Sequence, residues 1–89
     1  MTDQEDGGFT IEGADNVRRA HWLAVAHATA LEINTGIKAS RGSAVAACNR
    51  ITGRTARTKK KALRDLVEHM AADFGYEIRP GASIERALR

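Results

Sequence analysis

The chain has 89 residues, of which 43% are hydrophobic and 28% charged, with one proline and one cysteine. This length allows one small domain, which buries roughly 60–65% of its unfolded surface, and the single cysteine excludes an internal disulfide framework. No apolar run reaches the roughly 18 residues of a membrane span, and the acidic start MTDQEDGG is unlike a secretory signal. We therefore expect a soluble cytoplasmic protein.

The net charge of +3 is distributed unevenly along the chain. Residues 1–15 hold five acids and no base, whereas residues 38–64 hold nine bases and no acid. Such an asymmetry indicates contact with a polyanion, or with an acidic partner that can be the chain's own first residues.

The first residues divide into a polar lead and the start of the fold. Residues 1–8 are interpreted as a disordered acidic lead, which leaves residues 9–89 as a single helical domain. FTIE, residues 9–12, alternates apolar and polar side chains, which is typical of a short strand, and Gly13 ends it.

A first helix is predicted from Val17 to about Asn34. Asp15 or Asn16 can cap its free N–H groups, and Gly36 is a natural stop. Apolar residues fall nearly all round this helix, which indicates a helix that is central to its domain or shares a face with a second subunit. Because so small a chain can hardly cover such a helix completely, we expect a homodimer.

Two further helices follow the basic loop IKASRGS. The second covers AVAACNRI and the third reaches about Phe74. Their caps and stops are Ser43 and Gly53 for the second helix, and Thr55 or Thr58 and Gly75 for the third. The third helix has one apolar arc made of Ala62, Leu63, Leu66, Val67, Met70 and Phe74. On its outer side, Lys61–Asp65 and Arg64–Glu68 have the four-residue spacing of ion pairs.

The end of the chain repeats the alternating pattern. YEIR, residues 76–79, can pair with FTIE as a two-stranded ribbon lying on the helices, and SIERALR adds a last helical turn. The predicted fold class is therefore mainly α: a compact three-helix domain whose second and third helices resemble a helix-turn-helix unit, with an optional terminal β-ribbon.

The order of several segments is similar to that of a known group of proteins. IEGADNVR, LEINTGIK, ASRGSA and TKKKAL follow one another between residues 11 and 66. This pattern resembles small uncharacterised proteins of bacteriophages, including actinobacterial phages. The resemblance implies a phage protein that acts in the host cytoplasm, and it assigns no role to any residue.

Few side chains in the sequence have the spacing of a catalytic or metal site. The soft ligands His21, His27, His69 and Cys48 form no pair with zinc-finger spacing. No GxSxG, HExxH or glycine-rich phosphate loop is present. Cys48 fits a small buried apolar residue better than a nucleophile. We predict a protein that is not an enzyme and needs no metal or cofactor.

A weak anion site is suggested by SRGSAV. Free N–H groups at a helix start can hold an anion, and Lys38 and Arg41 lie close to Ser43 in the sequence. The simpler interpretation of Ser43 is an ordinary helix cap.

The strongest functional pattern is the basic segment 50–64, which consists of Arg50, Arg54, Arg57, Lys59, Lys60, Lys61 and Arg64. Several of these bases fall in the first turn of the third helix, where the helix dipole disfavours a positive charge by about 0.3–1 kcal/mol. Because folding gains nothing evident from them, we expect them to bind nucleic-acid phosphates, with the third helix at a groove.

Two alternatives to nucleic-acid binding stay open. The basic segment could meet the acids of a protein partner, which would be a host factor, a virion component or a second copy of the chain. It could also be a solvated face that keeps a small protein soluble. The nucleic-acid interpretation depends on one condition, that these side chains are not already neutralised by the chain's own carboxylates.

Overall fold

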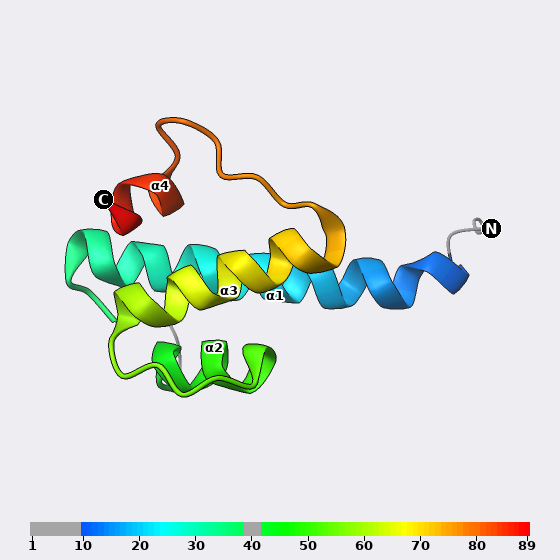
Figure 1. Ribbon diagram of the computed structural model, residues 1–89, viewed down its shortest axis with the longest axis horizontal. Coiled ribbons are helices and arrows are strands. Elements are labelled where there is room, and N and C mark those ends of the chain that lie inside the picture. The colour runs from blue at the N-terminus through cyan, green and yellow to red at the C-terminus, as the bar shows by residue number, and fades with distance from the viewer. Residues whose placement is uncertain (1–9, 39–41) are drawn as a thin grey trace.

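In the part of the chain that the structure describes, helices are joined by connections without strands (Figure 1). The computed structural model describes residues 10–38 and 42–89, with side chains from residue 16 onward. Within these residues the helices are α1 (Thr10–Thr35), α2 (Ala44–Thr52), α3 (Lys59–Phe74) and α4 (Ser83–Leu88). The mainly α class is confirmed, and the last helical turn predicted in SIERALR corresponds to α4.

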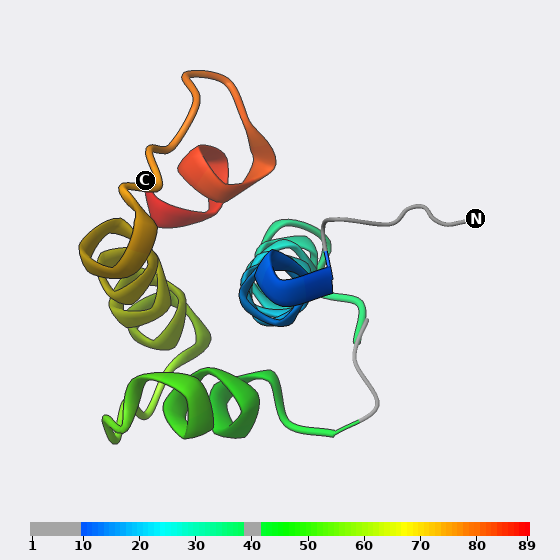
Figure 2. The ribbon, with the colours of Figure 1, turned by 90° about the vertical axis from the view of Figure 1, so that its right-hand side faces the viewer.

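α1 is the helix on which the other three pack. α2, α3 and α4 each contact α1. Seen along its axis they lie to one side of it, and the opposite side of α1 is covered by none of them, although the connection that follows α1 leaves on that side (Figure 2). Ala26 and Ala30 of α1 are fully buried, because small side chains let neighbouring helices approach closely. The rest of the buried core consists of Cys48, Ala62, Leu63, Leu66, Met70, Ile84 and Ala87.

The ends of α2 and α3 follow the local signals in the sequence. Ser43 and Thr58 cap these helices, with side-chain oxygens that accept backbone N–H groups at 3.1 and 3.2 Å. Gly53 and Gly75 end the same helices with φ angles of 74° and 72°. A residue with a β-carbon would be strained in this left-handed conformation, so glycine is the natural stop.

The two strands predicted at the ends of the domain are wrong. Residues 10–12 of FTIE belong to α1, and residues 76–79 form a connection without strand pairing in the described part of the chain. α1 therefore begins well before Val17. Lengthening an existing helix adds one hydrogen bond for each residue ordered, whereas an isolated two-stranded ribbon is marginal in water. The predicted disordered lead, residues 1–8, and Phe9 lie outside the described residues.

Aromatic side chains hold the connection between α3 and α4 on the bundle. The ring of Trp22 on α1 packs on that of His69 at 4.8 Å between centroids, and Phe74 lies between Trp22 and Tyr76 at 6.4 and 6.2 Å. Asn34 then attaches α4 to α1, because its Nδ2 donates to the carbonyl oxygen of Ser83 at 3.0 Å.

Candidate functional site

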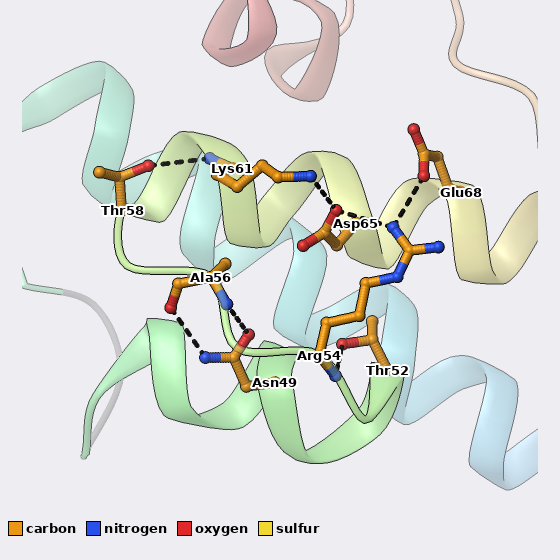
Figure 3. Close-up of polar contacts among 8 residues, drawn as sticks. All are labelled: Asn49, Thr52, Arg54, Ala56, Thr58, Lys61, Asp65 and Glu68. Carbon is orange, nitrogen blue, oxygen red and sulfur yellow. Dashed lines mark hydrogen bonds and ion pairs between the residues drawn. The ribbon is translucent and has the colours of Figure 1, made fainter.

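The basic segment begins at Arg50 in the last turn of α2 and continues over the connection between α2 and α3 and the first turns of α3, and Figure 3 shows part of it. Asn49 holds this connection from both sides: its Nδ2 donates to the Ala56 carbonyl at 3.0 Å, and its Oδ1 accepts from the Ala56 N–H at 3.0 Å. The connection spans residues 53–58, longer than the turn of about three or four residues in a helix-turn-helix unit. The helix-turn-helix likeness is therefore not confirmed.

The fixed connection places Arg54 beside two acids of α3. Its Nη1 donates to Oδ1 of Asp65 and to Oε1 of Glu68, each at 2.9 Å (Figure 3). Asp65 also accepts from Nζ of Lys61 at 2.7 Å, so the predicted Lys61–Asp65 pair is confirmed. Two bases of the predicted phosphate-binding set thus share one carboxylate of the chain itself.

The Asp65 carboxylate is the centre of this network. It is buried, with only 2% of its side chain exposed, whereas both bases that it meets are half exposed. The hydrogen bond from Lys61 lowers the pKa of Asp65, and that from Arg54 lowers it further, against the raising effect of burial. The pKa of Arg54 is raised by its bonds to Glu68 and Asp65. Asp65 is therefore held as a carboxylate.

A second acid of the fold neutralises the first residue of α3. Nζ of Lys59 lies 3.1 Å from Oε1 of Glu32 on α1, whose side chain is 2% exposed. Lys59 was predicted to lie in a first turn where its charge is unfavourable. In the structure the buried Glu32 accepts this charge while Lys59 stays half exposed, so that Lys59 links α3 to α1.

Two more bases of the segment lie over the end of α4. Nζ of Lys60 donates to the carbonyl oxygen of Arg89, and Nη2 of Arg64 donates to that of Leu88 at 3.4 Å. Carbonyls at a helix C-terminus attract bases, so these contacts favour the docking of α4. The predicted pair between Arg64 and Glu68 is wrong, because Glu68 meets Arg54 instead.

Only Arg50 and Arg57 of the basic segment remain exposed without an ion pair or hydrogen bond to the described residues. Arg54, Lys59 and Lys61 are neutralised by carboxylates of the chain. The expectation that folding gains nothing from these bases is therefore wrong. The prediction failed because the compensating acids come from later turns of α3 and from α1, whereas the rule about helix starts considers only residues of the first turn.

The described residues add no support for the weak anion site predicted around SRGSAV. Ser43 uses its hydroxyl oxygen to cap α2, which is the simpler interpretation. Lys38 is exposed, and Arg41 lies outside the described residues.

The soft ligands are dispersed over the described residues. Cys48 is fully buried, its Sγ lies 3.5 Å from the Thr29 hydroxyl, and burial raises the pKa of its thiol. In the part of the chain with described side chains, no three His, Cys, Asp or Glu residues come together as metal ligands would. Cys48 is thus a core residue.

A different surface is left uncovered on α1. Val17 and Leu31 are 70% and 49% exposed, although both are large apolar residues. They lie on one helix face with Ala24 between them, because seven residues make about two turns. Ala20 is exposed beside them. We call Val17, Ala20, Ala24 and Leu31 the outer face of α1. The seven-residue spacing of Val17, Ala24 and Leu31 can be read from the sequence, but the exposure of these residues cannot.

A shallow pocket continues this outer face toward α2. It has a volume of about 180 Å³ and lies between α1 and α2. Its lining is almost wholly apolar and consists of His21, Ala24, Val25, Ala28, Thr29, Ala44 and Ala47. Such a pocket offers contact area to an apolar side chain and few groups that could orient a polar ligand.

Comparison with family models, curated proteins and solved structures finds no match. None of the described helices has the length and apolar character needed to cross a bilayer. Two surfaces of the described residues therefore bear on function: a basic segment whose charges mostly have partners within the fold, and an apolar helix face that the described fold leaves open.

Proposed function

We propose that the protein is a non-enzymatic binding module that associates with another protein chain through the outer face of α1. The observation that carries this proposal is the exposure of Val17 and Leu31 on one face of the central helix. Scattered exposed apolar residues are common on any protein, but an aligned set beside an apolar pocket is typical of an interaction surface.

The shape of the outer face supports contact with a helix or a similarly smooth surface. Ala20 and Ala24 lie on the same side of α1 as Val17 and Leu31, and small side chains between larger ones let a second backbone come close. The pocket lined by His21, Ala28 and Ala47 could receive a larger apolar side chain of the partner. A helix laid on such a groove is a recurring mode of protein recognition.

The state of the basic segment also favours a protein partner over nucleic acid. Phosphate binding requires positive side chains that can leave their present partners, and Lys59 and Lys61 would each have to give up an ion pair with a buried carboxylate. The middle of α3 also presents Glu68 to solvent, and its carboxylate would not favour a phosphate backbone there.

The test is capture of protein partners from a bacterial lysate after nuclease treatment, with a differently tagged copy of the chain present. The baits are the wild type, Leu31→Glu, and Ala72→Glu as a matched charge control, since Ala72 is exposed on α3. We expect the wild type and the control to retain the same protein and Leu31→Glu to lose it. Capture that is equal for all three baits, or absent for all, would contradict the proposal.

Nucleic-acid binding remains a second candidate because of one observation. Arg50 and Arg57 are exposed and without a partner in the described part of the chain, and all fourteen Lys and Arg residues follow residue 15. Such binding would use these two arginines rather than all seven bases of the basic segment.

Fluorescence anisotropy with labelled duplex and single-stranded DNA at two salt concentrations tests this candidate. Each neutralised phosphate contributes a slope near −0.9 to log K against log salt. If the wild type binds at low salt, and the slope of log K against log salt becomes smaller by about two such contributions in the double variant Arg50→Ala/Arg57→Ala, phosphate contact is supported. No binding at low salt removes the candidate.

A further inference from the structure

We infer that the partner of the outer face of α1 is a second copy of this chain, with its α1 antiparallel to the first and a two-fold axis close to Ala24. This inference rests on the proposed function, because it names the occupant of the same surface. Identical chains associate most often as closed two-fold dimers, in which one patch meets itself.

The spacing of the outer face fits a two-fold axis. Ala24 lies seven residues from Val17 and seven from Leu31. An axis at Ala24 therefore places Val17 of each copy against Leu31 of the other, and the two Ala24 residues opposite each other. Each large exposed side chain then gains an apolar neighbour, and the small residue sits where the helices come closest.

The direction of the second helix follows from the dipole of α1. A parallel pair would align the two helix dipoles unfavourably, because ends of the same partial charge would lie side by side. An antiparallel pair places the positive end of each dipole beside the negative end of the other. The helix dipoles thus favour the antiparallel arrangement.

The rest of the fold leaves room for this contact. α2, α3 and α4 lie to one side of α1 (Figure 2), and the outer face lies on the other. With the axis at Ala24, the two helices overlap over residues 13–35, which is ~35 Å of a helix ~10 Å wide and gives each copy roughly 350 Å² of contact. A stable interface uses about 800 Å² from each partner. We therefore expect a reversible dimer with a dissociation constant in the micromolar range or weaker.

The first experiment measures mass by sedimentation equilibrium and light scattering from about 5 to 500 μM, a range that brackets a micromolar constant. We expect the average mass of the wild type to rise toward that of a dimer, and that of Ala72→Glu to follow it. Leu31→Glu should stay monomeric, because two carboxylates would then be buried against Val17. Circular dichroism confirms that each variant is folded.

The second experiment tests the direction by cross-linking. Val17→Cys and Leu31→Cys chains are mixed and oxidised, and native Cys48 can remain because it is fully buried. An antiparallel pair gives the mixed disulfide and little of either symmetric one. A parallel pair gives symmetric disulfides only, and that result would overturn the arrangement.

The outcomes separate this inference from the proposed function. A wild type that stays monomeric over the whole range overturns the inference, as does a dimer that Leu31→Glu leaves unchanged. If the lysate experiment still yields a different protein whose capture requires Leu31, the proposed function stands with another partner. If neither a dimer nor such a protein is found, both fail.

Discussion

The basic segment and the outer face of α1 give opposite impressions in the sequence and in the structure. In the sequence, the cluster of bases in residues 50–64 stands out, while Val17 and Leu31 are ordinary members of an apolar helix. In the structure, most of the bases have partners within the fold, whereas the two apolar side chains are exposed.

The contrast shows where a local rule loses its force. A base in the first turn of a helix is unfavourable only if nothing else balances it, and here Lys59 is balanced by Glu32 from α1, 27 positions away in the sequence. Whether a charged group lacks a partner therefore depends on the whole fold and not on its neighbours in the sequence. If this contrast holds, changes in the basic segment should lower stability, and changes in the outer face of α1 should lower partner binding.

The largest effect is expected at Asp65. Asp65→Ala removes the buried acceptor of Lys61 and Arg54, and we expect the free energy of unfolding to fall by about 2–3 kcal/mol. Urea unfolding followed by circular dichroism measures it. Glu68→Ala is the matched control, because Glu68 meets the same arginine but is more than half exposed, and its loss should be below about 1 kcal/mol. Equal losses would mean that Asp65 has no special structural role.

The pH dependence of stability should report the same carboxylate. The pKa of Asp65 is lowered from its ordinary 3.8, chiefly by the hydrogen bond from Lys61. The unfolded chain therefore takes up this proton at a higher pH than the folded one. Its contribution to stability is complete above the ordinary value and is lost as the pH falls through the folded pKa.

The comparison of wild type with Asp65→Asn isolates this effect, because Glu85 also has a lowered pKa and contributes equally in both chains. We expect urea unfolding at pH 7, 5 and 3 to show a steeper loss for the wild type between the last two values. Parallel curves would indicate that Asp65 is not held as a carboxylate by its neighbours.

A smaller effect separates two bases that lie two residues apart. Lys59→Ala removes an ion pair of the buried Glu32 and should lower stability by about 1–2 kcal/mol. Arg57→Ala removes an exposed side chain without a partner in the described residues and should change stability by less than about 0.5 kcal/mol. Thermal unfolding of both variants measures the difference. A reversed order would restore Lys59 as a candidate for contact with an external anion.

Much of the fold could be predicted because its signals are local. Ser43, Thr58, Gly53 and Gly75 each act within a few residues of themselves, and the ends of α2 and α3 that they indicate agree with the structure. The apolar arc of α3 likewise follows from helical spacing, with Leu63, Leu66 and Met70 fully buried.

The remaining features depend on which helices meet. The partner of Arg54 lies 11 residues away and is reached only because Asn49 holds the connection in place. Leu31 is exposed because α2, α3 and α4 all pack on the opposite side of α1. The alternation in FTIE was misleading for a related reason, since four residues carry too little pattern to outweigh the extension of a long helix.

The smallest effect on folding is expected at the outer face itself. In dilute solution Leu31→Glu should change the free energy of unfolding by less than about 0.5 kcal/mol, because Leu31 is half exposed and glutamate is a good helix former. If the wild type dimerises, the difference in stability between it and Leu31→Glu should grow with protein concentration, because association stabilises the folded state by mass action. The Tm of the wild type should therefore rise between about 5 and 500 μM, whereas that of Leu31→Glu should not. A large loss of stability at the lowest concentration would show that Leu31 belongs to the core of the single chain, and the contrast between the two regions would then disappear.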